Sequence, residues 1–271
     1  MQHIKVTFRT SLQQTKDMLM ALLSDIGYDG FEETDQALFA YIGQDVYDES
    51  ELNDRISALD ITYDIEVIPA QNWNALWESN FQPVIVDNFC TIRAHFHDIE
   101  VVTPYDIIIT PKMSFGTGHH ATTQLVIMQM EEIDFLGKAV LDFGTGTGVL
   151  AILAEMKGAM QVVGLDNDEW SIENARENVV RNDCKKITIR NEPIESIPDS
   201  TFDIILANIN RHILLQYMDN LYRKLKISGI IVMSGLLTED KDTITEAATK
   251  NGLHFVKFTE QNNWISIYFC K

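Results

Sequence analysis

Residues 140–150 read VLDFGTGTGVL, an apolar stretch, a glycine-rich turn and the start of a second apolar stretch. The first part predicts a buried strand and the last part the beginning of a helix. Glycine permits positive φ angles and lets the backbone approach a ligand closely. The free N–H groups at a helix start favour an electron-rich or anionic ligand. The stretch therefore predicts a strand–loop–helix unit that holds a ligand, although a tight turn alone would also explain three glycines.

A carboxylate follows this unit at an informative distance. Gly164-Leu165-Asp166 ends a second apolar stretch, and Asp166 comes 20 residues after Gly146. In nucleotide-binding βαβ units a carboxylate at this position accepts hydrogen bonds from the two ribose hydroxyls. The alternative interpretation is that Asp166 caps the next helix.

The spacing of the glycines bears on the kind of cofactor. The dinucleotide fingerprint is Gly-x-Gly-x-x-Gly, whose helix start binds a pyrophosphate. This chain instead has Gly-x-Gly-x-Gly, with Asp142 just before it. A carboxylate so near would not favour a pyrophosphate, but it would favour a sulfonium cofactor with a free amino group. The spacing thus disfavours an NAD-linked dehydrogenase.

Strands and helices are expected to alternate from residue 138 onward. Strands are predicted at 139–143, 161–166, 187–190, 202–208 and 229–234, and helices at 149–157, 169–182, 211–226 and 239–251. This alternation predicts a parallel sheet covered on both faces. The segments 255–259 and 264–270, around the turn at 261–263, predict an antiparallel hairpin at the end.

The N-terminal part has a different pattern. Residues 1–68 predict the order β-α-β-β-α-β, which fits a ferredoxin-like domain. Residues 69–82, rich in tryptophan, predict a connecting helix, and further strands are expected at 89–96 and 105–110. The chain is therefore expected to have a domain at 1–68, a linker helix at 69–82 and a larger domain at 83–271.

Composition limits the function classes. The 271 residues include 40 Asp and Glu against 21 Lys and Arg, so the formal net charge is −19. This disfavours direct nucleic-acid binding through phosphate neutralisation. No apolar run approaches the ~18 residues of a membrane span, and the three cysteines lie in no metal or redox spacing. We therefore expect a cytoplasmic protein without a metal site.

The acidic residues are concentrated near the N-terminus. Residues 1–68 hold 14 acidic and 4 basic side chains, whereas residues 69–271 hold 26 and 17. Such an excess is explained by a solvated surface that aids solubility. It also fits a module that docks a basic macromolecule, because opposite fields speed and orient encounter.

The glycine loop with Asp142 and Asp166 resembles the class I S-adenosylmethionine-dependent methyltransferases. Residues 111–123, PKMSFGTGHHATT, resemble the motif Phe-Gly-Thr-Gly-x-His-x-Thr-Thr of the ribosomal protein L11 methyltransferases, the PrmA family. Ala207-Asn208-Ile209 and residues 234–237 resemble further motifs of that family, so the resemblance covers nearly the whole chain. Departures from the common family pattern occur at Lys112, Ser114, Ala121 and Thr145.

The resemblance implies an α/β fold of the class I methyltransferase type. Its Rossmann-like sheet has seven strands, the last of them antiparallel, and follows a small ferredoxin-like α+β domain. It implies S-adenosyl-L-methionine as cofactor, bound by Thr123, Gly144, Gly146, Asp166 and Asn208. It places His119, His120 and Asn208 at the reaction centre, where His120 would orient the amine or relay its proton. His120 could instead only cap the following helix, and Asn208 could be a strand-ending turn residue.

The implied activity is methyl transfer to amines of the basic ribosomal protein L11, on lysine side chains, the α-amino group, or both. The enzyme is expected to act as a monomer, without membrane or nucleic-acid contact. Two rival functions remain: a methyltransferase for another protein or a small molecule, and a non-catalytic ribosome-associated binding protein. Turnover on a protein substrate distinguishes them.

Overall fold

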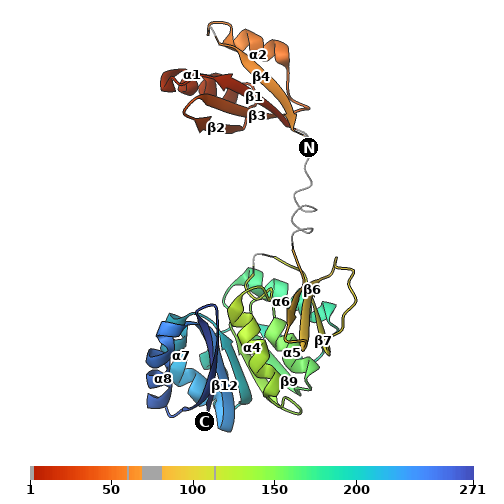
Figure 1. Ribbon diagram of the computed structural model, residues 1–271, viewed down its shortest axis with the longest axis vertical. Coiled ribbons are helices and arrows are strands. Elements are labelled where there is room, and N and C mark those ends of the chain that lie inside the picture. Colours follow the sequence, from red (N-terminus) through yellow and green to blue (C-terminus); the bar gives the residue numbers. More distant parts are fainter. Residues whose placement is uncertain (1–2, 60, 69–80, 113) are drawn as a thin grey trace. The chain divides into compact units, whose positions relative to one another are not determined.

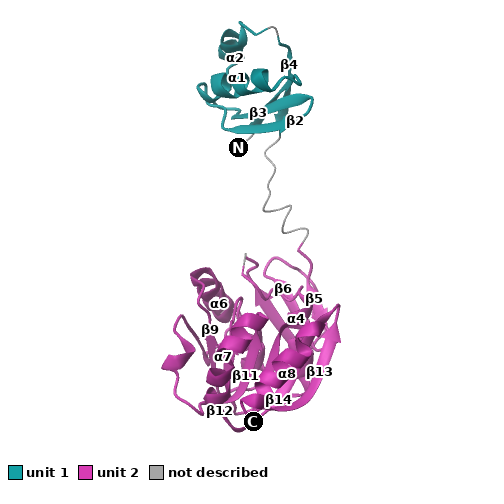
Figure 2. Ribbon diagram, turned by 90° about the vertical axis from the view of Figure 1, so that its left-hand side faces the viewer, with its two compact units in different colours: residues 1–80 teal, residues 81–271 magenta. Residues whose placement is uncertain are grey.

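The computed structural model describes residues 3–59, 61–68, 81–112 and 114–271. Its contacts divide the chain into two compact units, residues 1–80 and 81–271 (Figure 2). The connecting helix expected over 69–82 lies outside the described residues except at Phe81 and Gln82, which are not helical.

The first unit is built from four strands and two helices in the predicted order. These are β1 (His3–Arg9), α1 (Gln13–Ser24), β2 (Gly30–Thr34), β3 (Ala37–Gly43), α2 (Glu49–Ile56) and β4 (Tyr63–Ile68). The antiparallel sheet has the order β2-β3-β1-β4. Alternate residues of β1, Ile4, Val6 and Phe8, enter a core with Leu19 and Leu52 from the helices. This is the ferredoxin-like arrangement, and its apolar cluster is confined to the first unit.

The second unit contains a seven-stranded sheet. Its strands are β8 (Ala139–Phe143), β9 (Gln161–Leu165), β10 (Ile187–Arg190), β11 (Phe202–Asn208), β12 (Leu225–Leu237), β13 (His254–Gln261) and β14 (Trp264–Cys270). The order is β10-β9-β8-β11-β12-β14-β13, in which the first five strands are parallel and β14 is antiparallel to both neighbours. The predicted parallel sheet with a C-terminal antiparallel hairpin is therefore confirmed.

Helices cover both faces of this sheet (Figure 1). One apolar cluster contains α4 (Ala121–Glu132), α5 (Val149–Met156) and α6 (Glu169–Arg181). The other contains α7 (Arg211–Lys224) and α8 (Lys241–Lys250). Helix α4 was not among the helices predicted from the alternation. Its side chains are buried on most sides, so its sequence lacks the polar face that reveals a surface helix.

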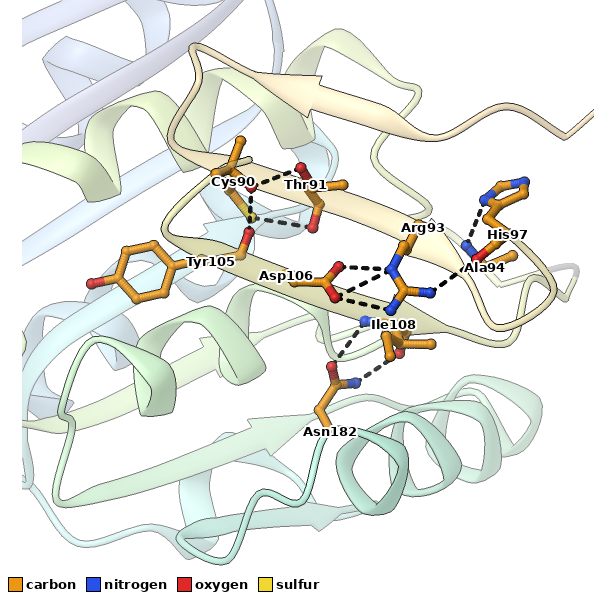
Figure 3. Close-up of polar contacts among 10 residues, drawn as sticks. Cys90, Thr91, Arg93, Ala94, His97, Tyr105, Asp106, Ile108 and Asn182 are labelled. Atoms are coloured by element: carbon orange, nitrogen blue, oxygen red, sulfur yellow. Dashed lines mark hydrogen bonds and ion pairs between the residues drawn. The ribbon is translucent and has the colours of Figure 1, made fainter. Parts of the chain in front are cut away.

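A small sheet leads into the loop before α4. It consists of β5 (Val84–Val86), β6 (Cys90–Ala94) and β7 (Tyr105–Ile109). Figure 3 shows that Arg93 pairs with Asp106 across β6 and β7, at 3.0 Å, and that Asn182 reaches β7 from the end of α6. The Asn182 side chain accepts from Ile108 N (2.8 Å) and donates to Ile108 O (2.7 Å). Its amide thus makes the pair of bonds that the backbone of a neighbouring strand would make. These bonds fix the end of β7, where the loop begins.

In the part of the chain that the structure describes, no helix combines the length and apolar character needed to cross a membrane.

Candidate active site

The glycine loop connects β8 to α5 through three left-handed glycines. Gly144, Gly146 and Gly148 have φ angles of 78°, 53° and 80°. A Cβ atom on Gly146 would lie 2.3 Å from the carbonyl oxygen of Phe115, so only glycine fits there. The glycine loop and the loop before α4 therefore meet backbone to backbone.

Asp142 holds the glycine loop from the core side. Its Oδ2 accepts hydrogen bonds from Thr145 Oγ1 (2.6 Å) and from Ala151 N (3.2 Å) in α5. Its Oδ1 is buried and has no hydrogen-bond partner among the described residues. Burial raises the pKa of Asp142 to about 7. The side chain lines neither cavity of the cleft described below, so its observed role is to anchor the loop.

Asp166 lies at the carboxyl end of β9, beside the glycine loop. Its Oδ2 accepts from Gly146 N (2.9 Å) and its Oδ1 from Asp168 N (3.1 Å). The cap of helix α6 is Asp168, whose side chain accepts from Ser171 N. The helix-capping role considered for Asp166 therefore belongs to Asp168. Each Asp166 oxygen keeps a further lone pair for a ligand hydroxyl.

Thr123 and Asn208 are 85 positions apart in the chain and meet in the structure. Asn208, the last residue of β11, donates from Nδ2 to Thr123 Oγ1 in the first turn of α4, at 3.3 Å. Asn208 Oδ1 is buried without a partner in the described part of the chain. A buried amide oxygen without a partner is costly, so this atom is a candidate acceptor for a bound ligand.

The two histidines lie in different surroundings. His120 caps α4, since its Nδ1 accepts from Thr122 N at 3.3 Å. Its ring contacts Trp264 and Phe115, with centroid separations of 4.6 and 5.2 Å. His119 is exposed, packs edge-on against Phe81 at 4.7 Å, and lines neither cavity of the cleft.

Two adjoining cavities form a cleft at the carboxyl ends of the parallel strands, the usual position of ligand sites in open α/β sheets. They share Gly144, Asp166, Ile209 and Asn210. The first, of about 310 Å³, is further lined by apolar side chains that include Leu165, Ile194, Ile213 and Tyr217, and by the polar residues Asn167 and Glu192. We call it the inner cavity. The second, of about 370 Å³, is further lined by residues that include Phe115, His120, Thr122, Asn208, Gly235 and Trp264. We call it the outer cavity.

Two aromatic residues of the outer cavity, Phe115 and Trp264, were not among the predicted site residues. Phe115 lay within the quoted motif, but the sequence does not reveal that its ring is exposed and lines a cavity. Trp264 begins β14, and β14 pairs with β12, so the C-terminal hairpin delivers this ring to the cleft. Nothing in the local sequence marks it as a site residue.

The cleft suits an elongated nucleoside derivative. The apolar side chains of the inner cavity could contact a base, and Asp166 lies where a ribose diol would be held. The unpartnered Asn208 Oδ1 could accept a hydrogen bond from a polar tail of the ligand or from a second reactant. Among the described residues, no group of three or more His, Cys, Asp or Glu side chains is placed to hold a metal ion.

Comparison with protein families identifies related sequences over nearly the whole chain. The family model described as ribosomal protein L11 methyltransferase (PrmA) matches residues 11–271. A ribosomal protein L11 methyltransferase of Phocaeicola vulgatus is 37% identical, and the match covers 99% of each chain. That of Chlorobaculum tepidum is 33% identical, with 97% of this chain and 95% of the relative covered.

A solved structure has the same architecture. The ribosomal protein L11 methylase from Lactobacillus delbrueckii subsp. bulgaricus superposes with a TM-score of 0.63 at 26% identity. The match covers 70% of this chain and 98% of that one.

The environment of Asp142 predicts a pH-dependent stability. The pKa of Asp142 is about 7 in the folded state and 3.8 ordinarily. Asp142 therefore leaves the free energy of unfolding unchanged below pH 3.8 and lowers it progressively as the pH rises to 7. Three pKa units correspond to about 4 kcal/mol. The Asp142→Asn variant, which does not ionise, should gain stability relative to wild type by up to this amount between pH 4 and pH 7, measured by urea unfolding. A stability difference that stays constant with pH would contradict this account.

Proposed function

Because the chain belongs to the ribosomal protein L11 methyltransferase (PrmA) family, we propose that it transfers methyl groups from S-adenosyl-L-methionine to amines of ribosomal protein L11. The acceptors are lysine side chains, the α-amino group, or both. The observation that carries the proposal is the convergence of Asp166 and Asn208 on one cleft, at the ends of two strands that flank the glycine loop.

The inner cavity would hold the adenosine part of the cofactor. Leu165, Ile194 and Ile213 offer an apolar slot for the base, and the Asp166 oxygens would accept from the ribose hydroxyls. Gly144 allows the backbone to approach the ligand where the two cavities join, and Gly146 does so in the outer cavity. When bound, the cofactor supplies an electrophilic methyl group on a sulfonium.

The outer cavity would receive the amine. A lysine ammonium with a pKa of ~10.4 must lose its proton before it can attack, which costs about 4–5 kcal/mol at pH 7. An α-amino group, with a pKa of ~7.7–8.0, needs much less help. The aromatic walls formed by Phe115 and Trp264 would partly desolvate the ammonium and lower its pKa. Asn208 Oδ1 would accept a hydrogen bond from the neutral amine and aim its lone pair at the methyl group.

His120 would position the amine rather than remove its proton. Since Nδ1 accepts from Thr122 N, a neutral ring carries its proton on Nε2 and has no free lone pair with which to take the proton of the ammonium, so it would act on the amine as part of the cavity wall. Its contacts with Phe115 and Trp264 hold the ring against the outer cavity. His119 is the second candidate for this role, from the exposed side of the same loop.

Replacing His120 by asparagine separates its two roles. Asparagine is a good helix cap, so His120→Asn should preserve the unfolding free energy while removing the ring. We expect turnover on the protein substrate to fall about tenfold, the equivalent of about 1.4 kcal/mol, with an altered pH profile. If His120→Asn kept full turnover and an unchanged profile, His120 would be a helix cap only.

The reaction itself is tested on ribosomal proteins from cells that lack this gene. These proteins are incubated with the enzyme and S-adenosyl-L-methionine, and their intact masses are measured. One protein, L11, should gain whole methyl units. Asp166→Ala should weaken cofactor binding about tenfold or more in calorimetry, because the hydrogen bonds to the ribose are lost together with the bond that holds Gly146 N in the glycine loop.

The negative outcomes have separate meanings. Methyl gain on another protein would show a methyltransferase with a different substrate. Cofactor binding without methyl gain on any ribosomal protein would favour a different substrate or a binding-only role. No cofactor binding at all would overturn the assignment of the cleft.

The acidic first unit would recognise the basic substrate, in the cytoplasm and without direct nucleic-acid contact. Residues 1–68 carry 14 acidic and 4 basic side chains, and complementary charge favours encounter with a basic protein. The first unit has an apolar cluster of its own, so the second unit keeps its core when the first is removed.

Deletion of residues 1–80 should therefore impair recognition more than chemistry. The remaining chain, 81–271, should retain its circular dichroism and cofactor affinity, whereas kcat/KM for the intact protein substrate should fall about tenfold or more. The 81–271 chain should methylate a short lysine-containing peptide with the same kcat/KM as the full chain. Undiminished methylation of the intact protein would contradict a docking role for the first unit.

A further inference from the structure

The glycine loop and the loop before α4 are joined by hydrogen bonds from one residue. Thr147, fully buried, donates from N to Phe115 O (2.9 Å) and from Oγ1 to Gly116 O (2.6 Å). A Cβ atom on Gly116 would lie only 2.8 Å from Thr147 Oγ1, which shows how closely the two loops pack. Consecutive carbonyls of one loop thus bond to a single residue of the other.

A second buried side chain fixes the start of the same segment. Asn178 of α6 donates from Nδ2 to Thr147 O (2.9 Å) and accepts at Oδ1 from Thr110 N (2.8 Å). It is fully buried. Thr110 is the residue after β7, so both the beginning of the loop and its Phe115–Gly116 step are tied to the glycine loop.

These contacts connect the two cavities of the cleft. The glycine loop contributes Gly144 to both cavities and Gly146 to the outer one, whereas the loop before α4 contributes Phe115 and His120 to the outer cavity. We propose that Thr147, supported by Asn178, is a positioning residue that transmits cofactor binding to the amine-binding wall. This inference rests on the proposed function, because it assigns the two ligands to the two cavities.

The hydroxyl of Thr147 can be removed with little change of shape. Thr147→Val keeps the backbone bond to Phe115 but leaves Gly116 O without its donor, whereas Thr147→Ser keeps the hydroxyl. Thr201→Val is the matched control, because Thr201 makes a similar bond to Pro198 O (2.6 Å) in the turn before β11. All three variants are made in the full chain and checked for folding.

We expect the loss of the hydroxyl to affect the amine substrate much more than the cofactor product. Thr147→Val should lower kcat/KM for the amine substrate about tenfold, the effect of losing one hydrogen bond, with the Kd of S-adenosylhomocysteine unchanged within about twofold. Thr147→Ser should restore most of the loss, and Thr201→Val should match wild type. Equal losses for both ligands, or no loss, would overturn the proposal.

Hydrogen exchange gives a readout that is independent of turnover. S-adenosylhomocysteine should slow amide exchange at residues 114–120 in wild type and in Thr147→Ser, but much less in Thr147→Val at equal saturation. Equal slowing in Thr147→Val, or no slowing in wild type with the ligand bound, would overturn the coupling alone. Failure of wild type to bind the ligand would overturn the proposed function, and the coupling with it.

Discussion

The structure of the cleft depends on the absence of a side chain at three alternate positions of one loop. A Cβ atom on Gly144 would meet Ile209 after β11 at 3.0 Å, and one on Gly148 would meet Ala175 of α6 at 3.3 Å. At Gly146 the neighbour is the backbone of Phe115, which cannot move aside. The loop can therefore touch three separate elements at once, and the positive φ angles required are ones that glycine adopts without strain. Two of these contacts, with Ile209 and Phe115, are with residues that line the cleft.

Parallel strands buried on both faces give apolar runs that are easily recognised, and this is why the sheet and the position of Asp166 just after β9 could be predicted from the sequence. Other features depend on partners that are distant in the chain. Helix α4 is buried on most sides and has no polar face to reveal it. Trp264 reaches the cleft only because β14 inserts between β12 and β13. The carboxylate of Asp142 before the glycine loop is evident in the sequence. Its burial in the core, and the place of Phe143 in the lining of the inner cavity, could not be predicted from it.

Two buried oxygens without partners illustrate why position matters more than residue type. Asp142 Oδ1 and Asn208 Oδ1 are equally unsatisfied within the described chain, and both belong to strand ends beside the glycine loop. Only Asn208 lines a cavity. An unsatisfied group in the core is a cost that the fold carries, and for Asp142 this cost takes the form of a raised pKa. An unsatisfied group on a cavity wall is available to a ligand, which would regain the missing hydrogen bond.

The distribution of charge separates attraction of a basic substrate from the reaction at its amine. A carboxylate close to a lysine would hold it as an ammonium ion and raise its pKa, which would oppose methyl transfer. Asp166 lies where the two cavities join, and its carboxylate already accepts hydrogen bonds from two backbone N–H groups. The further described residues that line the outer cavity include no carboxylate. About half of the excess of acid that would attract a basic protein lies in residues 1–68, with 14 acidic and 4 basic side chains, although this part is only a quarter of the chain. An enzyme that must attract cations but react with neutral amines gains from this arrangement, because the attraction then acts on the protein as a whole and does not stabilise the protonated form of the reacting group.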